Sequence, residues 1–139
     1  MKLAVIAVGK TDPQWAELVD EFLKRIEHFC KTDLIVTTDE KLLSQCEKYT
    51  RVFLLDEHGA EHTSKSFAGF LQKQLNSGVQ SVALVLGGAY GFSDALKARA
   101  DGLITLSKLT FPHQLARLIL LEQIYRGFTI LNNQKYHHE

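Results

Sequence analysis

Residues with the chemistry of a ligand site are concentrated toward the C-terminal end of this 139-residue chain. An apolar stretch, Val82–Leu86, runs into a glycine-rich segment, Gly87–Phe92, and a second stretch, Leu103–Leu106, runs into Ser107–His113. The chain ends with Tyr136–Glu139, which contributes an aromatic ring and two imidazoles. Glycine lets the backbone approach a small ligand closely, and histidine can take up a proton near neutral pH. The pattern predicts a ligand site with a reactive tail beside it.

His113 is a candidate for proton transfer because it follows Pro112 at the start of a predicted helix. Such a histidine can simply bond to backbone groups, or it can stay neutral near the helix N-terminus and accept a proton. Arg117 and Arg126 interrupt the same helix, where most arginines are solvated. Their spacing is about 2.5 helical turns, so at most one of them is expected to face a given site.

Three other patterns indicate little chemistry. Gly9-Lys10-Thr11 resembles the end of a phosphate-binding loop, but Ala4 stands where that motif needs glycine, which favours a strand-to-helix turn. The turn after Leu86 does not match the dinucleotide-binding glycine pattern, so its glycines serve either a tight turn or a ligand. His58 and His62 have metal-like spacing, but Gly59 disfavours a helix there. His137 and His138 are adjacent and point apart, and no metal site is expected.

Composition is typical of one cytoplasmic, soluble domain spanning residues 1–139, with 45% hydrophobic residues. Cys30 and Cys46 lack C-x-x-C spacing and are expected to be reduced thiols. The apolar run at Met1–Val8 is too short for a signal peptide, and no run reaches the roughly 20 residues that span a membrane.

The net charge is zero, from 16 basic and 16 acidic residues, which argues against a strongly basic nucleic-acid binder. Residues 86–139 contain six Lys or Arg and four Asp or Glu, a local excess of two positive charges. A local basic site is therefore compatible with the sequence, whereas a basic surface along the whole chain is not.

Strands and helices are predicted to alternate, which implies an α/β fold with a mostly parallel sheet between helices. Ligands of open parallel sheets bind beyond the carboxyl ends of strands, so the loops after Leu55, Leu86 and Leu106 are the expected site. The apolar face of the last helix is wide enough either for ordinary core packing or for a helix of a second copy. Strands are predicted over Lys2–Val8, Leu34–Val36, Arg51–Leu55, Val79–Leu86 and Leu103–Leu106, and helices from Pro13 to about Phe29 and over Glu40–Tyr49, Ser64–Asn76, Ser93–Ala100 and Pro112–Leu131.

Several motifs together resemble one family. Leu84–Ser93 reads L-x-L-G-G-x-x-G-F-S, Leu106–Arg117 reads L-S-x-L-T-F-P-H-x-L-x-R, and Glu122–Arg126 reads E-Q-I-Y-R. The opening M-K-L-x-x-x-A-V-G-K and the Tyr136-His137 tail extend the match over the whole chain. The sequence is similar to the SPOUT-class methyltransferases that modify N3 of a pseudouridine in 23S ribosomal RNA of the large subunit.

This resemblance implies a knotted fold, with a deep C-terminal trefoil knot, which is rare among proteins. It also implies S-adenosylmethionine as the methyl donor, with no metal, and with the donor bent into the knot. The donor contacts implied by motif position are Leu55, Gly87, Leu106, Ser107, Lys108, Leu109, Thr110 and Phe111.

The resemblance further implies a homodimer that acts on large-subunit rRNA in ribosomes, with each site completed by the tail of the partner. Some relatives carry Pro-Glu where this chain has Ala89-Tyr90, and some carry arginine in place of His138. A SPOUT enzyme acting on tRNA or another rRNA position, or a non-catalytic ribosome-binding relative, would carry similar motifs. The substrate-binding and catalytic roles implied by the family fall on His113, Arg126, Tyr136, His137 and Glu139.

Overall fold

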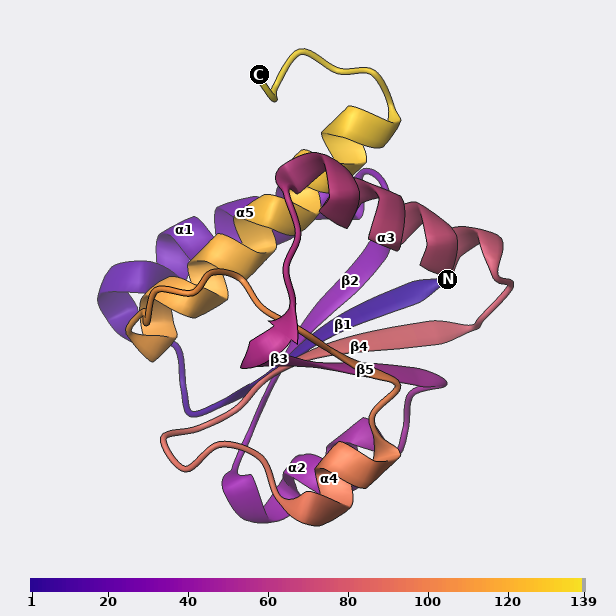
Figure 1. Cartoon of the computed structure of the whole chain (residues 1–139). Coiled ribbons are helices and arrows are strands. Elements are labelled where there is room, and N and C mark those ends of the chain that lie inside the picture. The colour runs from indigo at the N-terminus through magenta and orange to yellow at the C-terminus, as the bar shows by residue number, and fades with distance from the viewer. Residues whose placement is uncertain (139) are drawn as a thin grey trace.

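The computed structural model describes residues 1–138, in which five parallel strands form one sheet (Figure 1). The strand order is β2-β1-β4-β3-β5, so the chain crosses the sheet several times and brings distant segments to one edge. The α/β class with a parallel sheet, predicted from the sequence, is confirmed. The strands are β1 (Lys2–Val8), β2 (Lys31–Thr37), β3 (Arg51–Ala60), β4 (Ser81–Leu86) and β5 (Gly102–Ile104).

Helices cover both faces of the sheet. The three longer helices α1 (Pro13–Glu27), α3 (Ser64–Asn76) and α5 (His113–Leu131) lie on one face. The 3₁₀ turn η1 (Asp39–Lys41) and the short helices α2 (Leu42–Cys46) and α4 (Asp94–Arg99) lie on the other. Each strand alternates its side chains between the two layers, which is why apolar residues occupy successive positions along β1 and β4.

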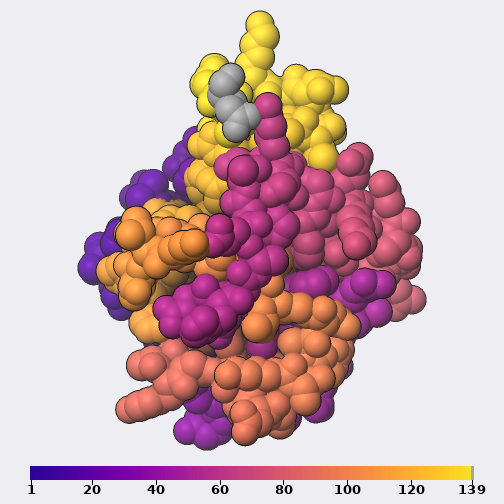
Figure 2. Space-filling view, viewed as in Figure 1, coloured from indigo at the N-terminus to yellow at the C-terminus, as the bar shows by residue number. Residues whose placement is uncertain are grey.

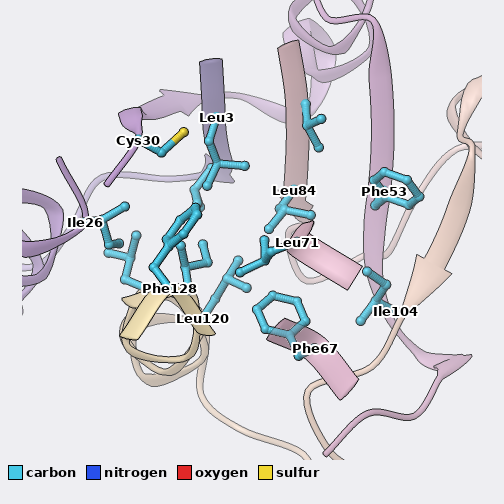
Figure 3. Close-up of a cluster of buried hydrophobic side chains, with 14 of the residues drawn as sticks. Leu3, Ile26, Cys30, Phe53, Phe67, Leu71, Leu84, Ile104, Leu120 and Phe128 are labelled. Atoms are coloured by element: carbon cyan, nitrogen blue, oxygen red, sulfur yellow. The ribbon is translucent and has the colours of Figure 1, made fainter. Parts of the chain in front are cut away.

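The larger core lies under α5, which packs between α1 and α3 (Figure 3). Leu120 and Phe128 of this helix are buried against the sheet residues Leu3 and Leu84. Two helical neighbours and the sheet account for much of the wide apolar face of α5. Leu115 and Ile119 nevertheless stay half-buried, one turn apart on the helix.

The two cysteines lie in different cores, Cys30 under the long helices and Cys46 under α2. Both are free thiols, as the sequence predicts. Burial raises the pKa of both thiols, that of Cys46 to about 11. None of the helices in residues 1–138 is long and apolar enough to cross a membrane.

Some predicted boundaries were wrong. Strand β3 continues past Leu55 to Ala60, and its pairing with β5 shifts register between these residues. Gly59, which the sequence analysis treats only as a helix breaker, allows this, because a Cβ there would lie 2.5 Å from the Ile104 nitrogen. The helix predicted over Glu40–Tyr49 forms only η1 and the short α2. The trefoil knot stays a prediction.

Candidate functional site

A cavity of about 350 Å³ opens at the carboxyl ends of β1, β3, β4 and β5, where the sequence predicts a site. The middle of β3, where its pairing with β4 ends, supplies Leu55, Asp56 and Glu57, and the turn after β4 supplies Gly87 to Phe92 except Tyr90. The segment between β5 and α5 and the first turns of α5 form the remaining walls. Segments that are far apart in the sequence therefore meet around one space.

The structure brings together seven of the eight predicted donor contacts. The exception is Lys108, whose Nζ lies 3.1 Å from Oε1 of Glu61 and which does not line the cavity. The predicted contacts that line the cavity are Leu55, Gly87, Leu106, Ser107, Leu109, Thr110 and Phe111.

The glycine-rich wall is a tight turn. The Gly91 N–H donates to the Gly88 carbonyl at 3.2 Å, and Gly91 has a φ of 72°, which favours glycine. A Cβ on Gly87 would lie 2.9 Å from the Phe92 ring. One on Gly88 would lie 3.0 Å from an Asp39 carboxylate oxygen. These glycines thus serve close packing within the protein, and the same turn forms one side of the cavity.

The opposite wall, residues 105–111, is held by side-chain hydrogen bonds to the backbone. Thr105 is buried, and its Oγ1 donates to the Ser107 carbonyl at 2.8 Å. The Leu109 N–H donates to Ser107 Oγ at 3.0 Å. The wall therefore has a defined shape although it contains no helix or strand.

The first turns of α5 are fastened to the loop after β1. Gln114 donates from Nε2 to the Lys10 carbonyl at 3.0 Å, and its Oε1 accepts from the Asp12 N–H at 3.0 Å. Asp12 occupies the N-cap position of α1, but its side chain makes no capping bond. These bonds fix the position of His113, which lines the cavity at the first position of α5.

Arg117 lines the same cavity and is only 1% exposed, although the sequence analysis expects arginines of this helix to be solvated. Its Nη1 donates to Thr11 Oγ1 and its Nη2 to the Gly9 carbonyl, each at 2.7 Å. Its Nε is buried without a hydrogen-bond partner in the described part of the chain. Burial lowers the pKa of Arg117, while the charge of Asp12 acts in the opposite direction. The hydrophobic pattern of the helix gave no sign of this buried charge.

Sequence reasoning also missed two carboxylates in the cavity, Asp56 and Glu57. Asp56 Oδ1 accepts from the His58 N–H at 2.8 Å, which fixes its orientation. Their position in the sequence could have identified them, because both residues follow Leu55 at the expected carboxyl end of a strand. Together with Arg117 they give the cavity groups of both charge signs, which suits a ligand that also carries both signs.

The other predicted catalytic residues form a separate cluster at the far end of α5. Arg126 Nε pairs with Glu122 Oε1 at 2.6 Å, and Arg126 Nη1 lies 3.0 Å from His137 Nδ1. The Arg126 guanidinium also stacks 4.8 Å above the Tyr136 ring, which meets the Tyr125 ring edge to face. Burial raises the pKa of Tyr136. We call Glu122, Tyr125, Arg126, Tyr136 and His137 the tail cluster.

The structure separates this tail cluster from the cavity. His113 and Arg126 are 13 positions apart on one helix, which corresponds to about 20 Å. Figure 1 shows the C-terminal tail beyond the C-terminal end of α5, away from the strand ends that form the cavity. The predicted catalytic residue Glu139 lies outside the described residues. Within residues 1–138, no three His, Cys, Asp or Glu side chains are grouped to hold a metal ion.

Comparison with solved structures shows the same fold. A probable methyltransferase from Bordetella pertussis matches with a TM-score of 0.58 at 14% identity, over 89% of this chain and 94% of that one. The SpoU methyltransferase AviRb from Streptomyces viridochromogenes, solved in complex with the cofactor AdoMet, matches with a TM-score of 0.52 at 12% identity. That match covers 90% of this chain and 57% of AviRb.

Sequence comparison is more specific. The chain is 43% identical to the ribosomal RNA large subunit methyltransferase H of Geotalea daltonii, over 99% of this chain and all of that protein. It is 40% identical to the protein of that name from Flavobacterium johnsoniae, over the full length of both. The family model described as "Predicted SPOUT methyltransferase" matches residues 1–137. The cavity at the strand ends and this full-length match agree, and the chain belongs to the SPOUT methyltransferase family.

Proposed function

We propose that the protein is an S-adenosylmethionine-dependent methyltransferase that modifies N3 of a pseudouridine in 23S rRNA of the large ribosomal subunit. We place this activity in the cytoplasm, in a homodimer. The observation that carries the proposal is the cavity, because seven of the eight donor contacts implied by the family motifs line it. Relatives at 43% and 40% identity are named for methylation of large-subunit rRNA, which supports this substrate class.

The donor fits the cavity in size and charge. About 350 Å³ lies within the usual range for small-molecule sites. S-adenosylmethionine carries a sulfonium, an ammonium and a carboxylate, and the cavity offers Asp56 and Glu57 on one side and Arg117 on another. When bound, the donor supplies an activated methyl group. The protein must then align it with the base and exclude competing nucleophiles.

In this proposal, a histidine removes the N3 proton of the target base. N3 of a pyrimidine base carries a proton at neutral pH, and a positioned base that removes it is typically worth about 10²- to 10⁴-fold in rate. His113 lies at the cavity, while Arg126, Tyr136 and His137 lie about 20 Å away in the same copy. A homodimer in which the tail of one copy reaches the cavity of the other would unite the two sets. The half-buried Leu115 and Ile119 on α5 offer an apolar contact for such a partner.

The test compares rRNA from cells with and without the protein by mass spectrometry, and repeats the reaction with purified protein, donor and large subunits. We expect one N3-methylated pseudouridine to disappear from the deleted strain and to be restored in vitro. Methylation of tRNA or of another rRNA position would contradict the substrate. Absence of donor binding by calorimetry would instead favour a non-catalytic ribosome-binding protein.

Gly87→Val tests the cavity itself. The added side chain must displace the Phe92 ring, which a Cβ would approach to 2.9 Å, and Phe92 also lines the cavity. We expect donor affinity to fall at least about tenfold, since overpacking typically costs about 1–3 kcal/mol. The matched control is Gly69→Ala in α3, where a Cβ meets nothing within 4 Å. Unchanged donor affinity in folded Gly87→Val protein would contradict the donor site.

A further inference from the structure

Two large hydrophobic side chains stand out by their exposure. Tyr90 is 94% exposed and Leu109 is 73% exposed, whereas the other exposed large hydrophobic residues among positions 1–138 are all below 45%. Scattered exposed hydrophobic residues are normal in soluble proteins and by themselves indicate nothing. Leu109, however, lines the candidate donor cavity, and Tyr90 lies between two lining residues, Ala89 and Gly91, of the other wall.

The position of Tyr90 is fixed by the turn that carries it. Ala89 and Tyr90 are the two central residues between Gly88 and Gly91, whose backbones are hydrogen-bonded. Ala89 and Gly91 line the cavity, while Tyr90 does not, so the ring stands at the rim. In Figure 2 the salmon segment that contains this turn protrudes at the lower left, below the orange segment that precedes α5. The ring is held outward by a short, hydrogen-bonded turn.

The charges near the rim favour a base over a phosphate as the occupant. Asp56 and Glu57 line the cavity and repel an anion. Lys108, the cation next to Leu109, already pairs with Glu61. An exposed aromatic ring binds unpaired bases by stacking, and this contact tolerates any base because every base has a π-face.

We propose that Tyr90 stacks on an unpaired nucleobase of the RNA substrate that flanks the target nucleotide, with Leu109 completing the apolar rim. The inference rests on the proposed function and adds a substrate contact outside the donor cavity. A base that must enter an enzyme cavity leaves its own stack, and a ring at the rim can replace part of the lost stacking. Tyr90 therefore contributes to RNA binding and has no part in donor binding or in proton transfer.

The test is steady-state methylation of purified large subunits by wild type, Tyr90→Ala and Tyr90→Phe. We expect Tyr90→Ala to raise the KM for the subunit about tenfold and to leave kcat within about twofold, as the loss of one stacked base predicts. Tyr90→Phe keeps the ring and should behave as wild type. Leu75→Ala, which truncates an exposed residue of α3, is the control for a general surface effect. Donor affinity by calorimetry should be the same for all four proteins.

The outcomes separate this inference from the proposed function. If wild type methylates the subunit and Tyr90→Ala has an unchanged KM, the stacking contact is refuted while the function stands. If Tyr90→Ala weakens donor binding, or converts dimer to monomer in sedimentation, the ring covers the donor or a second copy and the inference is also wrong. If wild type neither binds nor methylates the subunit, both proposals fail together.

Discussion

The two ends of α5 hold their arginines in different ways. Arg117, near the N-terminal end, is buried and donates to the Gly9 carbonyl and the Thr11 hydroxyl of the loop after β1. Arg126, near the C-terminal end, is partly exposed and contacts Glu122 of its own helix and Tyr136 of the tail. The first end is bonded to the sheet framework, and the second is held by side chains of the helix and of the chain terminus.

This difference indicates that the two ends of α5 have separate roles. The N-terminal end forms a fixed wall of the cavity, because the buried Arg117 bonds to backbone and hydroxyl groups of the loop after β1. The C-terminal end depends on partly exposed side-chain pairs, which can be exchanged for contacts with another molecule. One helix thus carries both a rigid part of one site and a cluster that can contribute to another. We interpret this as the design of a composite site in the proposed homodimer.

Deleting residues 136–139 should have the largest effect. If the tail completes the partner's site, the truncated protein should fold and bind donor normally but lose methyl transfer at least about a hundredfold, the low end of general-base loss. Activity is measured on large subunits at saturating donor. Full activity would show that the tail cluster takes no part in catalysis, and loss of donor binding would show that the two ends of α5 are not independent.

Mixing variants tests the composite site directly. The tail deletion and Gly87→Val should each be inactive alone, but a mixed dimer contains one intact cavity facing one intact tail. Refolding the two variants together at equal amounts should restore about one quarter of wild-type activity, since half of the dimers are mixed and each has one working site. If no activity returns, cavity and tail must come from the same chain or the protein is not a dimer.

Substitution of Arg117 should mainly lower stability, whereas substitution of Arg126 should mainly lower activity. Arg117→Met removes two hydrogen bonds of a buried guanidinium, to Gly9 and Thr11, and should lower the free energy of unfolding by about 2 kcal/mol or more. Arg126→Met removes a partly exposed pair and should destabilise the protein less than Arg117→Met does, yet it should impair methyl transfer as the tail deletion does. Urea unfolding at fixed protein concentration gives the first quantity.

Arg25→Met is the control for Arg126, since Arg25 also pairs with a glutamate one helical turn away, Glu21, in a more exposed position. Equal destabilisation by Arg117→Met and Arg126→Met would remove the contrast between the two ends. A stable and fully active Arg126→Met would leave the tail cluster without a function.

Sequence patterns predict most helices and strands of this fold, because strands that are buried between two layers of helices are apolar at successive positions. The apolar runs in the predicted strands Lys2–Val8 and Val79–Leu86, and the helical spacing of Ser64–Asn76, lead to β1, to β4 with a start two residues later, and to α3. Ser93, the first residue of the predicted helix Ser93–Ala100, caps α4, as its Oγ accepts from the Leu96 N–H. Loops after strands were the expected site because parallel strands end at one edge.

Sequence patterns do not predict features that depend on contacts between segments far apart in the chain. The burial of Arg117 depends on the Val8–Thr11 loop, more than 100 positions away, and no spacing within α5 reveals it. The extension of β3 beyond Leu55 depends on contact between Gly59 and Ile104. The separation of His113 from the tail cluster could be anticipated from helix length alone, since α5 is a continuous helix over 19 residues.

The smallest expected effect concerns the titration of Tyr136. Burial is the main cause of its raised pKa, Glu122 raises it further, and Arg126 lowers it. Arg126→Gln should therefore raise the pKa of Tyr136, and Glu122→Gln should lower it. A phenol whose pKa is raised on folding stabilises the folded state below its unfolded pKa of about 10, and this contribution is lost as the pH rises through the folded value.

The measurement is a pH titration by NMR of protein labelled at tyrosine Cζ, with Tyr136→Phe to assign the resonance among the four tyrosines. Arg25 lowers the same pKa less than Arg126 does, so Arg25→Gln should give a smaller shift in the same direction. Opposite shifts for Arg126→Gln and Glu122→Gln would show that the tail rests on α5 in solution. If neither substitution moves the titration, Tyr136 does not lie beside Glu122 and Arg126 in solution, and the C-terminal end of α5 is then open to another molecule.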